Sequence, residues 1–154
     1  TMAKIEDEIK SKFQNEKQKF IVNLMFTSNW IKNNHAELLR PYNITSQQYN
    51  ILRILRGNGD FMPMSTVKER MIDKSPNTTR LVDKLIEKGF VERKRCDEDR
   101  RVVYAKICKK GLDILSELDE KMDKPFAGLL DVISDDEAKK ANQILNKLRG
   151  EKNL

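Results

Sequence analysis

Apolar residues recur at helical spacing along most of the chain, and this pattern predicts a mostly helical fold. The first stretch, residues 4–40, has no Gly or Pro to interrupt it and is predicted to form one helix of roughly 55 Å, at about 1.5 Å per residue. Its apolar stripe exceeds what the core of so short a chain needs, so we expect it to pack against a second copy of the chain. The stripe comprises Ile5, Ile9, Phe13, Phe20, Leu24, Ile31 and Leu38, and Ile21 and Met25 widen it.

Five more helices are predicted, over residues 45–56, 65–72, 76–88, 110–131 and 135–149. Thr45 with Gln48, and Ser134 with Glu137, have the spacing of capping boxes, in which the two side chains satisfy the backbone at the start of a helix.

The helix over residues 76–88 has its own boundary signals. Ser75 is predicted to be its N-cap, Pro76 its first residue, and Gly89 its C-terminal cap.

After Gly89 the spacing of apolar residues is no longer helical. Residues 90–96 and 101–107 are predicted to be two strands, and the polar tip at 97–100 joins them into a hairpin. The fold class expected is therefore mostly α with one small β-hairpin.

Basic and acidic residues are segregated along the chain. The net charge is +6, with a pI near 9.3. Residues 74–110 carry 12 Lys and Arg against 6 Asp and Glu, whereas residues 111–137 carry 9 acidic residues against 2 Lys. A concentrated basic segment indicates a polyanionic partner, either nucleic acid or an anionic membrane surface.

Other sequence features narrow the classes of protein. Two cysteines do not make a disulfide framework, and no stretch is typical of a signal peptide or of a membrane span of about 20 apolar residues. We expect a cytoplasmic protein of one domain, residues 1–154, without a cofactor, a bound metal or a membrane partner.

A short helix, a turn, a capped helix and a basic hairpin follow one another in the order that a DNA-binding module needs. The capped helix offers Pro76, Asn77, Thr78, Thr79, Arg80 and Lys84, and its N-terminus at Ser75 offers N–H groups to a phosphate. The hairpin adds Arg93, Lys94, Arg95, Arg100 and Arg101. Alone, such a hairpin is more often a solvated surface, but its place after this helix favours contact with double-stranded DNA.

These segments resemble the MarR (multiple antibiotic resistance regulator) family. The resemblance is carried by residues 78–93 and 97–101, and extends to Leu39-Arg40-Pro41 and to Thr45, Gln48, Tyr49, Leu52 and Arg53. It implies a winged helix-turn-helix region over residues 44–108, flanked by dimerisation helices at 4–40 and 110–150. It also implies a homodimeric repressor on a palindromic operator, often released by a small molecule or by oxidation.

The resemblance gives roles to two residues, Asp99 as the brace of the wing and Arg101 as a side chain that enters the minor groove. The chain departs from the family pattern at Ile72-Asp73, where the turn usually holds a small residue. It departs again at Ile107-Cys108, where the family usually has Leu-Thr.

The family pocket for an effector implies a second candidate site, lined by Trp30, His35, Arg40 and Tyr49. For each of these residues an ordinary packing or surface role is the alternative. Cys96 lies among cationic residues that favour a thiolate, so a redox switch competes there with incidental exposure, which we favour. Cys108 is expected to be an inert, buried residue.

Two other functional classes compete with a dimeric repressor. An enzyme acting on nucleic acid would need clustered carboxylates, an activated nucleophile or a phosphate loop, and we identify none in the sequence. A protein that coats DNA without sequence preference would not need polar side chains suited to reading bases.

Overall fold

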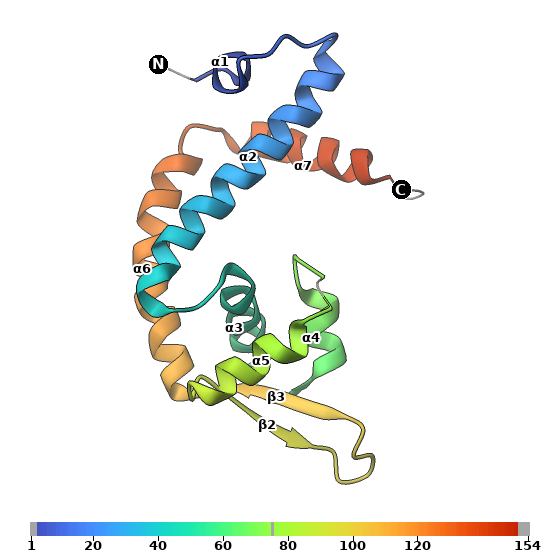
Figure 1. Cartoon of the computed structure of the whole chain (residues 1–154), viewed down its shortest axis with the longest axis vertical. Helices are drawn as coiled ribbons and strands as arrows, with labels where there is room; N and C mark the ends of the chain where they lie inside the picture. The colour runs from blue at the N-terminus through green and yellow to red at the C-terminus, as the bar shows by residue number, and fades with distance from the viewer. Residues whose placement is uncertain (1–2, 75, 151–154) are drawn as a thin grey trace. The chain divides into compact units, whose positions relative to one another are not determined.

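The computed structural model describes residues 3–74 and 76–150, which divide into two compact units, Thr1–Leu115 and Ser116–Leu154 (Figure 1). The elements of the first unit are, in chain order, α1 (Ile5–Ile9), α2 (Glu16–Leu39), the 3-10 helix η1 (Arg40–Tyr42), α3 (Ser46–Asn58), β1 (Met62–Pro63), α4 (Met64–Arg70), α5 (Thr78–Glu87), β2 (Val91–Arg95) and β3 (Val103–Ile107). Helix α6 (Lys109–Leu130) begins in the first unit and ends in the second, where α7 (Asp135–Arg149) follows.

The first predicted helix is wrong in one respect, because residues 4–40 form two helices rather than one. Lys10 adopts a left-handed backbone with φ of 49°, which ends α1. Asn15 then caps α2, since its side chain accepts a hydrogen bond from the Gln18 N–H at 2.8 Å. The Gln18 side chain in turn accepts from the Gln14 N–H at 2.8 Å. Polar side chains that bind the local backbone thus break the helix without Gly or Pro.

Helix α3 begins where its capping box predicts. The Thr45 hydroxyl accepts from the Gln48 N–H at 3.1 Å, and the Gln48 side chain accepts from the Thr45 N–H at 2.9 Å. The helix ends at Asn58, two residues beyond the predicted end, and Gly59 takes the left-handed conformation with φ of 76°. The second predicted capping box, Ser134 with Glu137, is also present at the start of α7.

The hairpin of β2 and β3 forms as predicted, but it belongs to a three-stranded antiparallel sheet in the order β1-β3-β2. Strand β1 was not predicted. It has only two residues, one of them Pro63, and pairs Met62 with Ala105. A segment so short has no alternating pattern to detect.

The core of the first unit is enclosed by α3, α4, α5 and the sheet, whose elements contact one another. Its fully buried side chains include Leu39, Ile51, Leu52, Leu55, Val67 and Leu85. A mostly helical chain with a helix-turn-helix and a hairpin wing confirms the predicted fold class.

Helices α6 and α7 match their predicted ranges within one residue. Leu115, Leu118 and Met122 of the predicted α6 stripe are buried, whereas Ile144 and Leu148 of α7 remain exposed.

Candidate nucleic-acid interface

Helix α5 buries one face and exposes the other. Leu81, Val82 and Leu85 are buried, and Gly89, with φ of 77°, ends the helix in the predicted left-handed turn. The Gly89 N–H donates to the Ile86 carbonyl at 2.9 Å and the Phe90 N–H to the Leu85 carbonyl at 3.0 Å, a pair of bonds that defines a Schellman cap. This packing and this cap fix the helix, so its polar face has a set orientation.

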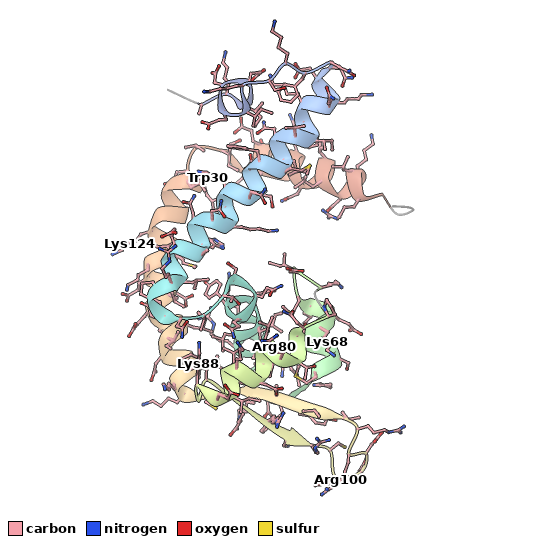
Figure 2. The ribbon with its side chains drawn as sticks, in the orientation of Figure 1. Trp30, Lys68, Arg80, Lys88, Arg100 and Lys124 are labelled. Carbon is pink, nitrogen blue, oxygen red and sulfur yellow. The ribbon has the colours of Figure 1, made fainter. Side chains whose placement is uncertain are left out.

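The exposed face carries most of the predicted contact residues. Asn77, Thr79, Arg80 and Lys84 are exposed, and Figure 2 shows Arg80 on α5. Arg80 and Lys84 line a shallow hollow with Asn77 and Lys88, while Thr79 lies on the flank that faces the hairpin. The helix therefore presents two polar flanks to a ligand.

Thr78 was expected on this exposed face, and that placement is wrong. Its side chain is 1% exposed, and its hydroxyl donates to the Met71 sulfur at 3.3 Å. Thr78 packs the start of α5 against the end of α4 and cannot present its side chain to DNA.

The start of α5 also differs from the prediction. The helix begins at Thr78 with Asn77 as N-cap, so Pro76 lies in the turn before the helix and not at its first position. Ser75, the predicted N-cap and phosphate ligand, lies outside the described residues. Pro76 is exposed and lines a small surface hollow with Lys68, Glu69 and Lys74.

Polar side chains of α3 hold the turn that leads into α5. The Ile72 N–H donates to the Asn50 side chain at 3.0 Å, and the Gln47 amide donates to the Asp73 carboxylate at 2.7 Å. The departure from the family pattern at residues 72–73 is accommodated by these bonds. The Ile72 side chain is 88% exposed.

One buried amide links α3 directly to α5. Gln48 is 3% exposed, and besides its capping role it donates to the Leu81 carbonyl at 3.4 Å. Because a buried polar group is costly without its partners, Gln48 couples the position of α5 to the start of α3.

A groove of about 450 Å³ lies between α4, α5 and the hairpin. Thr79 and Asp83 line it from α5, and Arg93, Arg95 and Arg101 line it from the hairpin. Arg93 is held within the groove by an ion pair with Asp83, in which Nη1 lies 2.9 Å from Oδ1. The hairpin arginines and the exposed face of α5 thus border one surface.

At the tip of the wing, Asp99 holds Arg101 through both side chain and backbone. The Arg101 Nε and Nη2 donate to the two Asp99 carboxylate oxygens at 3.0 and 3.2 Å, and the Arg101 N–H donates to Oδ1 at 3.1 Å. These bonds to Arg101 keep the pKa of Asp99 below its ordinary value. The Arg101 side chain remains 91% exposed, so this geometry would allow Asp99 to brace a guanidinium that still faces outward.

The neighbouring arginines of the tip are exposed as well. Arg95 Nη1 donates to the Arg100 carbonyl at 2.9 Å, so this bond links the end of β2 to the turn that follows it. Figure 2 shows Arg100 at the end of the hairpin, away from the helices.

Sequence reasoning did not include Lys68 and Lys88 among the predicted contact residues. Lys68 of α4 is exposed and lines the groove with the hairpin arginines, and Lys88 follows α5 on the flank of Arg80. Lys94 and Lys106 lie over the ring of Phe61, at 4.2 and 5.5 Å from its centre. Helical spacing from Arg80 and Lys84 would have found Lys88, whereas Lys68 joins the groove only through tertiary packing.

The four predicted effector residues lie in different local surroundings. Tyr49 is buried beneath the Arg53 guanidinium, which lies 5.7 Å from its ring centre. His35 is half-buried, and burial, followed by the charge of Arg53, lowers its pKa. Arg40 is exposed and pairs with Glu37.

Trp30, the fourth predicted effector residue, lies elsewhere. It is separated from His35 by about 140° around α2, because five residues turn a helix by about 500°. Trp30 lines a pocket together with residues of α1.

Both cysteines are free and half-buried. Burial, and then the charge of Glu92, raise the pKa of Cys108, which disfavours its thiolate. Cys108 also ends the wing, because its N–H donates to the Phe90 carbonyl at 2.8 Å.

Within residues 3–74 and 76–150, no group of three or more His, Cys, Asp or Glu side chains has the arrangement of a metal site. No helix in the same part of the chain is long and apolar enough to cross a membrane.

Known proteins share this fold and parts of this sequence. The model of the MarR family matches residues 44–103. The HTH-type transcriptional regulator MhqR of Bacillus subtilis (strain 168) is 24% identical over 110 residues, which cover 71% of this chain and 75% of that protein.

Two solved structures match nearly their whole length. A MarR transcription factor from Planctomyces limnophilus has 29% identity and a TM-score of 0.68, covering 87% of this chain and 98% of that one. A mutant MarR from E. coli, complexed with operator DNA, has 26% identity and a TM-score of 0.71, covering 90% of this chain and 99% of that one.

Proposed function

Because this chain belongs to the MarR family of transcriptional regulators that bind DNA, we propose that it is a sequence-specific repressor. It binds a palindromic operator as a homodimer and is released by a small-molecule or oxidative signal. Such a regulator works in the cytoplasm beside the chromosome and has no enzymatic activity of its own.

The observation that carries this proposal is the surface shared by α5 and the wing. Arg80 and Lys84 are exposed on a helix whose other face is buried, and Arg101 is exposed at a braced tip. A rigid helix with polar side chains fits the major groove, and an outward arginine beside it fits the narrow, strongly negative minor groove.

We assign the contacts by chemistry. Asn77 and Arg80 suit the edges of adenine and guanine, and Thr79 lies near enough to the wing to add a hydroxyl contact. We propose that Lys84, Arg93, Arg95 and Arg100 contact phosphates, and such contacts supply affinity rather than sequence preference. Thr78 contributes through packing.

Dimerisation is supported by apolar side chains that one chain leaves uncovered. Met25 of α2 is 63% exposed, and Ile144 of α7 is 52% exposed. We propose that residues 4–40 and 110–150 pair with their copies around the reading region 44–108. Sedimentation at micromolar concentration is expected to give a dimer, and Met25→Lys is expected to shift it toward monomer. A monomeric parent protein would contradict the proposal.

The DNA-binding proposal is tested by sequencing the fragments that the protein retains from sheared DNA of its own source at physiological salt. The expected result is a palindrome with half-sites about one helical turn apart. An Arg80→Ala variant serves as the matched control and is expected to lose the enrichment. Binding without any enriched sequence would instead support a protein that coats DNA.

A further inference from the structure

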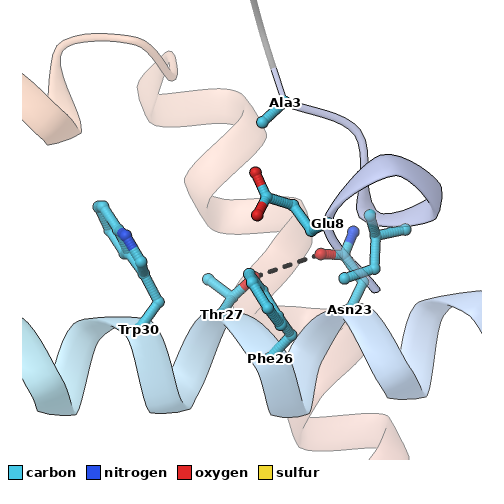
Figure 3. Close-up of a pocket in the computed structure, with 7 residues that line it drawn as sticks. Ala3, Glu8, Asn23, Phe26, Thr27 and Trp30 are labelled. Atoms are coloured by element: carbon cyan, nitrogen blue, oxygen red, sulfur yellow. Dashed lines mark hydrogen bonds between the residues drawn. The ribbon is translucent and has the colours of Figure 1, made fainter. Parts of the chain in front are cut away.

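A pocket of about 260 Å³ lies between the N-terminal segment and the middle of α2, away from the surface that we assign to DNA (Figure 3). It is smaller than the typical site for a drug-sized ligand, which is about 300–1,000 Å³. The side chains that define its chemistry are Ile5, Glu8, Asn23, Phe26, Thr27 and Trp30.

The wall formed by α1 is held by specific contacts. The Ile5 side chain is 5% exposed. Glu6 forms an ion pair with Lys19 of α2, and hydrogen bonding to Lys19 lowers the pKa of Glu6. The pocket is therefore enclosed on one side by a segment that apolar burial and an ion pair attach to α2.

Two aromatic and two polar side chains form the α2 side of the pocket. Phe26 and Trp30 lie one turn apart on the same face of α2, and Figure 3 shows both rings beside the space below α1. Between them the Thr27 hydroxyl donates to the Asn23 side chain at 3.3 Å, so this hydrogen is already used within the wall.

Glu8 supplies a charge that the wall does not neutralise. Figure 3 shows its carboxylate extending from α1 into the space above Thr27. Among residues 3–74 and 76–150, Glu6 has Lys19 as its cationic partner, whereas no ion pair joins Glu8 to a Lys, Arg or His. A carboxylate beside aromatic rings attracts an organic cation, because the ring faces and the carboxylate both favour positive charge.

We propose that this pocket binds a small aromatic or quaternary ammonium cation, with Glu8 opposite its charge and Phe26 and Trp30 against its apolar surface. We further propose that this class of molecule is the effector of the regulator, a step that rests on the proposed repressor function.

Two exposed apolar residues of α2 that we propose for dimerisation, Ile21 and Met25, lie on a different side of the helix from Asn23 and Thr27 of this pocket. They lie about 120–160° around the helix from Asn23 and Thr27, since each residue turns the helix by about 100°. A second chain packed on Ile21 and Met25 would therefore approach α2 from a side away from Asn23 and Thr27.

The binding step is tested by fluorescence, since Trp30 is the only tryptophan in the chain. The full-length protein is titrated with benzyltrimethylammonium, benzyl alcohol and benzoate. We expect a saturable change in Trp30 emission with the cation at a concentration at least tenfold lower than with benzoate, because only the cation is attracted by Glu8. No saturable change with the cation at millimolar concentration, or equal responses to cation and benzoate, would overturn the site.

Two charge-neutralising variants on α1 test whether Glu8 is the residue that attracts the cation. Glu8→Gln is expected to raise the midpoint for the cation about fivefold, in the range of an exposed ion pair. Asp7→Asn, an exposed neighbour outside the pocket, is the matched control and is expected to leave the midpoint unchanged. Equal midpoints for both variants would overturn the role of Glu8, and the emission spectrum of each free variant shows whether the pocket around Trp30 is retained.

The effector step is measured separately, by the affinity for the operator fragment with and without saturating cation. Weaker DNA binding with the parent protein, restored by Glu8→Gln at the same cation concentration, supports it. Saturable cation binding without any change in DNA affinity would overturn the effector role. Failure to bind any operator would contradict the proposed function, while the fluorescence result would still decide the site.

Discussion

Replacement of Arg101 by alanine tests the proposed role of the wing most directly. In the free protein the Arg101 guanidinium is oriented by two hydrogen bonds to Asp99 while its side chain stays 91% exposed. The variant removes one oriented cation without opening a cavity. We therefore expect the thermal midpoint of unfolding to be unchanged and only DNA binding to suffer.

The expected loss follows from the chemistry of one arginine contact. An arginine in the minor groove supplies both a charge and donors to base edges, so its loss is expected to weaken operator binding about five- to a hundredfold. When the variant binds, it displaces about one cation fewer from the DNA phosphates than the parent protein does. The magnitude of the slope of log affinity against log salt should therefore decrease by about one.

The assay is fluorescence anisotropy of a labelled operator duplex at several salt concentrations, with Arg149→Ala of α7 as the matched control. The Asp99→Asn variant distinguishes two roles for Asp99, orienting the Arg101 side chain or repelling the DNA phosphates. If Asp99 braces Arg101, the variant binds DNA more weakly than the parent, but less weakly than Arg101→Ala. If Asp99 only repels phosphate, the variant binds more tightly. Unchanged affinity and salt slope in Arg101→Ala would refute the role of the wing tip.

Four further predictions concern stability. Gly111→Ala should lower the free energy of unfolding by about 1–3 kcal/mol or more, because a Cβ would lie 2.5 Å from the Phe90 carbonyl oxygen. Gly57→Ala, with no atom within 4 Å of its Cβ, should raise it by up to about 1 kcal/mol in the same urea titrations. Gln48→Ala should cost about 1–3 kcal/mol and weaken operator binding, and a normal operator affinity would deny its coupling of α3 to α5. Burial holds the pKa of His35 below 6.5, so the unfolded chain binds the proton first as the pH falls. The free energy of unfolding should therefore decrease from about pH 7.5 to 5.5, and a parent protein with the same slope as His35→Asn would contradict this.

Local signals predicted the elements that local interactions determine. The capping box of Thr45 and Gln48 places the start of α3, and Gly89 marks the end of α5, because each depends on residues within one turn of the helix. The hairpin was predictable for the same reason, since its change of period and its polar tip are contiguous in the sequence.

Tertiary contacts decided what the sequence did not predict. Strand β1 exists because Met62 and Pro63 pair with β3, about 40 residues later in the chain. Thr78 is polar and lies among residues expected to contact DNA, yet packing against Met71 buries it. The break at Lys10 depends on a balance between helix continuation and polar capping at Asn15, which hydrophobic spacing cannot reveal.

The basic charge of the hairpin also has a different meaning in the structure than in the sequence. Along the chain, Arg93, Arg95 and Arg101 count only as positive charge. In the fold each is restrained, by Asp83, by the Arg100 carbonyl and by Asp99, respectively. Ordering a long side chain costs up to about 2 kcal/mol of conformational entropy. Because these side chains are already restrained in the free protein, they lose less conformational entropy when DNA binds. The acidic residues of the basic segment therefore favour a defined arrangement of cations, which suits a reader of DNA shape better than charge alone does.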